Sequence, residues 1–160
     1  IGIDDTDSRE GGATFALALA LLQFLGATKG VIPIGHHIVM LNPDVPWRTA
    51  GNSCSYIELA VTPESCEKVV ERSLLFVEDE ALSAEWGIAV KQGFRIDPSL
   101  RSYGRSARDD IVSQKTAEET AGKHGIDLNG GRGVIGALAA VALSGLPNDI
   151  LLSPERTIPL

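Results

Sequence analysis

The chain has 160 residues, 44% of them hydrophobic and 22% charged, a composition that fits one globular domain able to bury its own core. Its formal net charge of −7 opposes tight binding of a nucleic-acid backbone by this piece alone, because such binding depends on clustered positive charge. The longest apolar run, residues 15–22, falls well short of the roughly 20 residues that a membrane-spanning helix needs. We therefore expect a cytoplasmic protein without a membrane partner, although a local basic groove remains compatible with the charge.

The first half of the chain alternates strand and helix signals. A short apolar strand at residues 1–3 enters an acidic turn, and helix formers follow over residues 13–25 up to Gly26, a residue typical of C-terminal caps. β-Branched residues predict two further strands, at 31–41 and 53–61, on either side of a loop that contains two prolines.

The alternation continues past the second of these strands. Thr62 as N-cap and Pro63 at the first helical position begin a helix that extends to about residue 77. A short apolar strand is expected at 86–90. The charged segment 97–110 contains a proline and a glycine, and its sequence leaves open a pair of helices or a mobile loop.

The last third contains a polar helix and an apolar one. The polar helix begins at Ser113 or Gln114 and ends at Gly125. Glycine-rich residues 129–133 then form a loop that opens directly on an apolar helix of small residues, 134–143.

Strands and helices thus alternate without an internal repeat or a linker, which predicts an α/β fold: one compact nucleotide-binding, kinase-like domain over residues 1–160, with a mixed sheet flanked by helices. The chain begins at Ile1, without Met and inside an expected strand, so we expect it to be trimmed or part of a longer polypeptide. Cys54 and Cys66 have neither the spacing nor the nearby histidines of a zinc site, and they indicate two reduced thiols.

The Asp-rich loop, residues 4–8, is the first candidate site. Asp4, Asp5 and Asp7 place three carboxylates within four residues, an arrangement that favours a cation between them. Mg²⁺ prefers such oxygen ligands, and Gly11 and Gly12 would let a phosphate approach the backbone before the next helix. The alternative is a solvated turn in which an Asp or Ser caps that helix.

The glycine-arginine loop, residues 130–133, is the second candidate. Backbone amides at Gly131 and Gly133 could bind an anion at the start of the following helix, with Arg132 adding a bidentate guanidinium contact to phosphate. The spacing is neither that of a Walker loop nor that of a dinucleotide fingerprint. A tight turn that brings helices close together explains the same glycines equally well.

The proline loop, residues 42–52, is the third. Its polar side chains include Asn52, a candidate nucleotide ligand, and Arg48, whose guanidinium could stabilise charge on a transferring phosphoryl group. Trp47 could stack on a base, but anchoring the loop in the core is the favoured interpretation.

Three separated blocks in this order, residues 1–8, 41–52 and 131–140, resemble the archaeal isoleucine-tRNA 2-agmatinylcytidine synthetases. The resemblance extends over nearly the whole chain, but it covers only the N-terminal kinase domain of that family, which activates a cytidine carbonyl by phosphorylation before agmatine attacks. In that family the Asp-rich loop binds metal and nucleotide phosphates, and a threonine shortly after it becomes phosphorylated. Thr14 matches that threonine.

Two departures accompany the match. Residues 12–15 read GATF where the family has a Cys-Thr-Thr context, and residues 48–52 read RTAGN without the family's second basic residue. The family's ferredoxin-like domain, OB-fold and zinc ribbon, which grip tRNA, have no counterpart in this sequence. A divergent stand-alone relative, similar to uncharacterised methanogen proteins with the same acidic loop, therefore remains open.

The resemblance implies an ATP- and Mg²⁺-dependent phosphoryl-transfer enzyme of uncertain acceptor. Its catalytic residues would be Asp5, Asp7, Thr14 and Arg48. Its partner would be a nucleotide, with tRNA a substrate only if further domains are present. The alternative is a non-catalytic nucleotide-binding module or a subunit of a larger assembly, and the sequence does not determine the oligomeric state.

Overall fold

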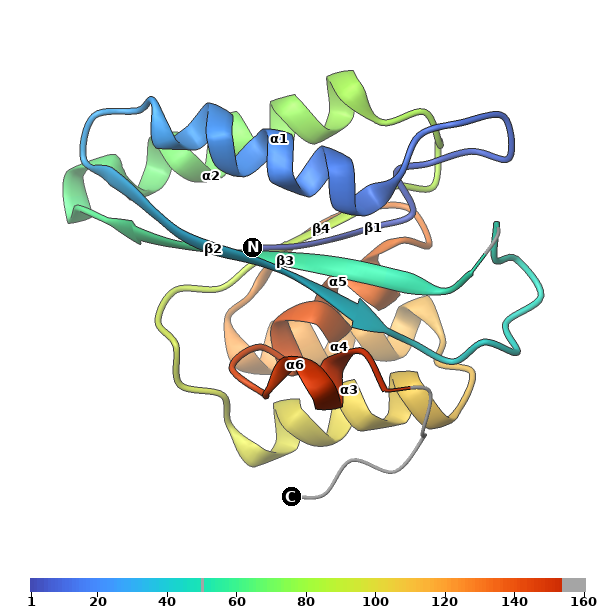
Figure 1. Cartoon of the computed structure of the whole chain (residues 1–160). Coiled ribbons are helices and arrows are strands. Elements are labelled where there is room, and N and C mark those ends of the chain that lie inside the picture. The colour runs from blue at the N-terminus through green and yellow to red at the C-terminus, as the bar shows by residue number, and fades with distance from the viewer. Residues whose placement is uncertain (50, 154–160) are drawn as a thin grey trace.

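Five strands form one sheet, and helices cover both of its faces (Figure 1). The computed structural model describes residues 1–49 and 51–153. The strands are β1 (Gly2–Asp4), β2 (Val31–Met40), β3 (Ser53–Val61), β4 (Gly87–Val90) and β5 (Asp127–Gly130). The helices are α1 (Thr14–Gly26), the 3₁₀ turn η1 (Pro63–Ser65), α2 (Cys66–Glu80), α3 (Pro98–Asp109), α4 (Gln114–His124), α5 (Val134–Ala142) and α6 (Asn148–Leu151). None of these helices is long and apolar enough to span a membrane, a finding that holds for the described residues.

The strand order is β2-β3-β1-β4-β5, and each of these neighbouring pairs is antiparallel. Helix α1 connects β1 to β2, and helix α2 connects β3 to β4. The two strands of each pair run in the same direction, but β3 lies between β1 and β2, and β1 lies between β3 and β4. Apart from the 3₁₀ turn η1, the elements from β1 to β4 thus have the ferredoxin-like βαββαβ arrangement. The sequence analysis mentioned a ferredoxin-like domain only as a separate module of the family that the chain resembles. The predicted α/β class with flanking helices is confirmed. The sheet, however, is antiparallel where a mixed sheet was expected, because strands that run in the same direction are never neighbours in it.

Two hydrophobic cores lie on opposite faces of the sheet. Helices α1 and α2 cover one face, where Ile3, Leu21 and Leu25 are fully buried. Helix α5 crosses the other face, and α3 and α4 pack against it (Figure 1). Leu138 and Leu143 of this second core are also fully buried. Because the central strand is covered on both sides, it is held in place by packing as well as by its two neighbours.

Glycines allow α5 to touch the sheet backbone. A Cβ on Gly2 would overlap the carbonyl oxygen of Ala137, and a Cβ on Gly87 would overlap the backbone of Gly133. This contact brings the N-terminal end of α5 directly beside the end of β1, where the Asp-rich loop begins. The fold thus places the glycine-arginine loop next to that loop.

Segment 97–110 forms one helix, α3, rather than a pair of helices or a mobile loop. Asp97 caps it, since its Oδ1 accepts a 2.9 Å hydrogen bond from the backbone N–H of Ser99, and Pro98 occupies the first helical position. Leu100 and Tyr103 on its inner face are buried. The capping residue and this apolar face outweigh the proline and the glycine that suggested a break.

Smaller differences lie at element ends. Gly26 is the last residue of α1 and Ala27 is the cap, while the turn at Pro63–Ser65 is 3₁₀ rather than the first turn of α2. Gly130, expected in a loop, pairs with Gly87 as the last residue of β5. The strand predicted at residues 53–61 has those bounds in the structure.

Candidate functional site

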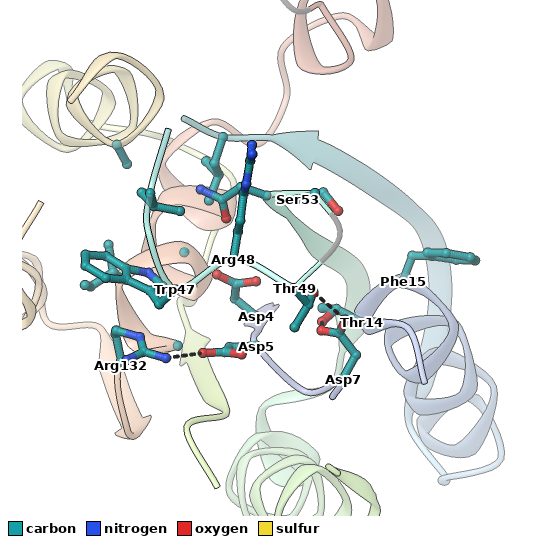
Figure 2. Close-up of a pocket in the computed structure, with 18 of the residues that line it drawn as sticks. Asp4, Asp5, Asp7, Thr14, Phe15, Trp47, Arg48, Thr49, Ser53 and Arg132 are labelled. Atoms are coloured by element: carbon teal, nitrogen blue, oxygen red, sulfur yellow. Dashed lines mark hydrogen bonds and ion pairs between the residues drawn. The ribbon is translucent and has the colours of Figure 1, made fainter. Parts of the chain in front are cut away.

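A cavity of about 260 Å³ opens where the end of β1 meets the N-terminal ends of α1 and α5 and the proline loop (Figure 2). Most of the predicted site residues line it, although they come from four separate parts of the sequence. They are Asp4, Asp5, Asp7, Gly12, Thr14, Arg48, Asn52, Arg132 and Gly133. Gly11 and Gly131 do not line it: Gly11 pairs with Ser8 in a turn of the acidic loop, and Gly131 donates its N–H to the carbonyl of Trp86.

Asp4 lies against the first turn of α5. A Cβ on Gly136 would overlap the Asp4 carboxylate, so only glycine leaves room for this side chain. Burial raises the pKa of Asp4 well above its usual value; hydrogen bonding to the Asp5 backbone opposes that rise, and the charges of Asp5 and Asp7 add to it. The N-terminal end of a helix favours negative charge, and the α5 terminus lies beside this carboxyl group.

Asp5 adopts a left-handed backbone conformation with φ of 54°, which non-glycine residues rarely adopt. One carboxylate oxygen lies 3.6 Å from Nη2 of Arg132 (Figure 2). Burial raises the pKa of Asp5 and Arg132 lowers it, while Asp7 and Glu85 raise it further. In this strained conformation the Asp5 carboxylate faces Arg132, the only residue that forms an ion pair with it among the described residues.

Arg132 is held on two sides. Its backbone N–H donates a 2.8 Å hydrogen bond to the Glu85 carboxylate, and its guanidinium lies over the ring of Trp47, 5.2 Å from the centroid. Trp47 is 37% exposed, so it does not anchor the proline loop in the core as expected. Within the described part of the chain no acceptor bonds the buried Nε of Arg132. The side chain as a whole is 36% exposed and lines the cavity, so its guanidinium is a candidate donor for an incoming oxyanion.

Asp7 joins the Asp-rich loop to two other elements. One of its oxygens accepts a 2.9 Å hydrogen bond from the Thr49 hydroxyl in the proline loop, and the other lies 3.4 Å from the Thr14 hydroxyl at the start of α1. The Thr14 oxygen in turn accepts hydrogen bonds from the backbone N–H and the hydroxyl of Thr6, both at 3.2 Å. Asp7 is thus engaged with protein hydroxyls.

Two predicted residues of the proline loop are engaged within that loop. The Arg48 guanidinium donates to the Pro43 carbonyl, and Figure 2 shows it directed away from the aspartates. The Asn52 amide donates a 2.7 Å hydrogen bond to the Asn42 carbonyl and closes the base of the loop. Ala50, which belongs to the same motif, lies outside the described residues.

The N-terminal end of α1 forms another wall of the cavity. Its N-cap, Ala13, provides no side-chain hydrogen bond, and Gly12 before it has a φ of 82° that favours glycine. A helix N-terminus without a side-chain cap presents backbone N–H groups and a partial positive charge, both of which suit an anion. The cavity therefore combines carboxylates on one side with anion-attracting groups on two others.

The three aspartates do not gather around one point. Among the described residues no set of three His, Cys, Asp or Glu side chains is arranged to hold a metal ion. Asp7 is bound to two hydroxyls, which leaves the adjacent Asp4 and Asp5 as carboxylates for a cation. Mg²⁺ is commonly bound by one or two carboxylates together with water and phosphate oxygens, so this pair is compatible with it.

Comparison with known proteins shows which proteins this chain is similar to. Residues 1–62 match the family model of the TiaS TCKD domain. The isoleucine-tRNA 2-agmatinylcytidine synthetase TiaS of Acidilobus saccharovorans is 33% identical over 149 residues, which cover 89% of this chain and 34% of that protein. The corresponding protein of Methanosarcina acetivorans is 33% identical over 98% of this chain and 36% of its own length.

The chain is thus similar to the TiaS proteins in sequence and in fold. It spans about a third of the length of those two relatives. It is also 32% identical to an uncharacterised protein of Methanocaldococcus jannaschii, MJ0921, of which it covers 49%.

Solved TiaS structures share the fold. The crystal structure of TiaS in complex with its isoleucine tRNA and ATP superposes with a TM-score of 0.77 at 29% identity, over 88% of this chain and 35% of that one. The complex of TiaS with the same tRNA, AMPCPP and agmatine gives a TM-score of 0.74 at 28% identity, again over 88% of this chain and 35% of the TiaS chain.

The sequence analysis missed Glu85, which orients the glycine-arginine loop. The sequence gives no signal for this residue, because its contact depends on β4 bringing it beside Arg132. Thr6 and Gly136 do lie within the motifs that the sequence shows, but their contacts with Thr14 and with the Asp4 carboxylate appear only in the structure.

Replacing Gly136 by alanine tests the close approach of Asp4 to α5. A Cβ there overlaps the carboxylate, so we expect Gly136→Ala to lower the free energy of unfolding by about 1–3 kcal/mol, the usual cost of overpacking. Gly122→Ala is the matched control, since that helical glycine is exposed with open space around it, and alanine should stabilise α4 by up to about 1 kcal/mol. Urea denaturation measures both, and a neutral or stabilising Gly136→Ala would contradict the contact.

The hydrogen bond between Thr49 and Asp7 can be tested by a double-mutant cycle. Thr49→Val keeps the shape but removes the hydroxyl, and we expect a loss of about 1 kcal/mol that disappears when Asp7 is already Ala, which has no acceptor. Thr49→Ser retains the donor and should lose clearly less. Equal losses with and without the Asp7 carboxylate would show that the two side chains are not coupled.

Proposed function

We propose that this cavity binds ATP with Mg²⁺ and transfers a phosphoryl group. The observation that carries the proposal is the meeting of Asp4 and Asp5 with Arg132 between two helix N-termini in one cavity. Carboxylates suit a hard cation, while the guanidinium and the helix ends suit phosphate oxygens. The TiaS complexes with ATP and AMPCPP support a nucleotide at the corresponding domain.

The phosphates are bound by the positive groups of the cavity. Arg132 lines the cavity with a partly exposed side chain, and Trp47 and Glu85 hold it in place before any ligand arrives. The end of α1 at Gly12 and the end of α5 at Gly133 add backbone groups on either side. Gly11 and Gly131, outside the cavity wall, shape the turns that place these groups rather than contact the nucleotide.

Asp4 and Asp5 hold the metal ion, which neutralises phosphate charge when it is bound. Asp7, through Thr49 and Thr14, fixes the relative positions of the Asp-rich loop, the proline loop and α1. Thr14 therefore positions Asp7, because its buried hydroxyl already accepts two hydrogen bonds and lies beside the carboxylate. Phosphorylation of Thr14 would require this network to open.

Arg48 contributes during transfer by turning from the Pro43 carbonyl toward the phosphoryl group. The residue is exposed at the cavity wall, so nothing buried opposes that rotation. Asn52 supports it indirectly by closing the base of the proline loop. Catalysis by such a site consists mainly of positioning and electrostatic stabilisation.

We propose that tRNA is the acceptor only when further domains accompany this chain. The TiaS structures contain tRNA, and one also contains agmatine, but the chain covers only 35% of those polypeptides. Its net charge of −7 agrees with a tRNA-binding surface that lies elsewhere.

The second candidate function is a nucleotide-binding module without turnover. The engagement of Arg48 with the Pro43 carbonyl and the saturated Thr14 hydroxyl favour it, because both groups assigned to transfer are already bonded within the protein.

Asp5→Asn is the sharpest test of the site. Asparagine tolerates the left-handed backbone conformation of Asp5, so the fold should persist while the charge is lost. We expect Mg²⁺-dependent ATP affinity, measured by calorimetry, to fall about tenfold or more, and phosphate transfer from γ-labelled ATP to be abolished. Glu10→Gln removes an exposed carboxylate from the same segment and should change neither.

The outcomes separate the two functions. ATP turnover or labelled protein that is lost in Asp5→Asn supports phosphoryl transfer. Saturable ATP binding with no product after long incubation supports the binding module. Folded protein that binds no ATP would contradict both.

A further inference from the structure

The segment between α2 and β4, residues 82–86, belongs to none of the three motifs at the cavity, yet it contacts two of them. We call it the connecting segment. Its first residues bond the Asp-rich loop, and its last residues bond the glycine-arginine loop. All five residues are described, and none of them lines the cavity. They can therefore influence a bound ligand only through the residues that they hold.

The first half of the connecting segment fixes the backbone of the Asp-rich loop directly after Asp5. The carbonyl of Thr6 accepts hydrogen bonds from the N–H groups of Leu82, at 2.8 Å, and Ser83, at 3.4 Å. Thr6 is buried, so water does not compete freely for this carbonyl. The left-handed conformation of Asp5, with φ of 54°, persists only if its surroundings hold it. The connecting segment supplies such a hold at the adjacent residue.

The second half fixes the backbone of the glycine-arginine loop at three consecutive residues. Gly131 donates its N–H to the Trp86 carbonyl at 2.8 Å, and Gly133 donates to the Glu85 carbonyl at 2.7 Å. Between them, the Arg132 N–H donates a 2.8 Å hydrogen bond to the Glu85 carboxylate. Glu85 thus holds this loop with both its backbone and its side chain.

The two glycines beside Arg132 make room for Glu85. A Cβ on Gly131 would lie 2.7 Å from a Glu85 carboxylate oxygen, and a Cβ on Gly133 would lie 2.6 Å from the Glu85 carbonyl oxygen. Both separations are shorter than a side chain tolerates. The loop therefore accepts Glu85 at this distance only because glycine stands on either side of Arg132.

The Arg132 side chain extends from this fixed backbone toward Asp5 and Trp47. Its Nη2 lies 3.6 Å from Oδ2 of Asp5, and its guanidinium lies over the Trp47 ring (Figure 2). A long side chain loses less conformational freedom on binding a ligand if its surroundings have already oriented it. The cation and the carboxylate meet where one five-residue segment holds the backbone at or beside each of them.

We propose that Glu85 is a positioning residue that holds the Arg132 guanidinium beside Asp5 at the cavity. Glu85 acts through the backbone, because its carboxylate accepts from the Arg132 N–H. The charge of Glu85 by itself works against a phosphate, since like charges repel, so the hydrogen bond has to contribute more than the charge costs. The benefit of this arrangement to ligand binding rests on the proposed function.

Glu85→Ala and Glu85→Gln separate the hydrogen bond from the charge. Glutamine keeps an oxygen acceptor for the Arg132 N–H without the charge, whereas alanine removes both. We expect the affinity for Mg²⁺-ATP, measured by calorimetry, to fall about three- to tenfold in Glu85→Ala and to be retained or raised in Glu85→Gln. Glu80→Ala removes an exposed carboxylate at the end of α2 and should leave the affinity unchanged.

Two results of this comparison would overturn the proposal. Equal or tighter binding in Glu85→Ala would show that the charge of Glu85 outweighs its hydrogen bond. Equal losses in Glu85→Ala and Glu85→Gln would show that the acceptor oxygen is not what matters.

A background without the guanidinium distinguishes positioning from a purely structural contact. Glu85 bonds the backbone of Arg132, so this hydrogen bond survives in Arg132→Ala. In that background Glu85→Ala should no longer change the ATP affinity, but it should still lower the free energy of unfolding as it does with Arg132 present. An affinity loss of the same size with and without the guanidinium would contradict the proposed role.

The Arg132 Nε–H resonance gives a readout that needs no ligand. The guanidinium lies over the Trp47 ring, 5.2 Å from the centroid, so the ring current should shift this NMR signal upfield. Glu85→Ala should move the signal toward its value in an unfolded chain, and Glu85→Gln should leave it in place. An unchanged signal in Glu85→Ala overturns the proposal whether or not the chain binds ATP. A signal that moves in a protein without ATP binding supports the positioning of Arg132 and contradicts the proposed function instead.

Discussion

The close contact between α5 and the central strand is the constraint on which the rest of the structure depends. It exists because glycine occupies positions 2, 87, 133 and 136, where any Cβ would overlap backbone or the Asp4 side chain. The contact closes the second core, and it also sets the glycine-arginine loop beside the end of β1. The glycines that allow this packing thus also determine where the carboxylates and Arg132 meet.

From that contact follows a site in which three neighbouring aspartates have three different environments. Asp4 is buried against the α5 terminus, Asp5 is directed at Arg132 by a strained backbone, and Asp7 is bound to hydroxyls from two other elements. This division explains how so many carboxylates coexist in a small volume. Under the proposed function, the first two carboxylates are the ones available to a cation, while the third links the Asp-rich loop to the proline loop and α1.

Much of the fold could be predicted because its signals are local. The strand at 53–61 follows from β-branched residues, and the helix that ends at Gly125 follows from a glycine that the structure places in the left-handed conformation. Other elements depended on contacts that no local pattern records. Segment 97–110 forms a single helix whose inner face is buried. Trp47 lies at the cavity, where the guanidinium of Arg132, 85 residues later in the chain, lies over its ring.

The sequence by itself determined most of the strands and helices before residue 126, the α/β class and the three motifs that relate the chain to TiaS, because each depends on residues close together in the chain. Only the tertiary structure decided which motif residues share a cavity and that Asp7 binds hydroxyls from two other elements. Several of the deciding contacts join partners 40 or more positions apart, as with Asp7 and Thr49 or Glu85 and Arg132, and such pairs meet only when the sheet is assembled.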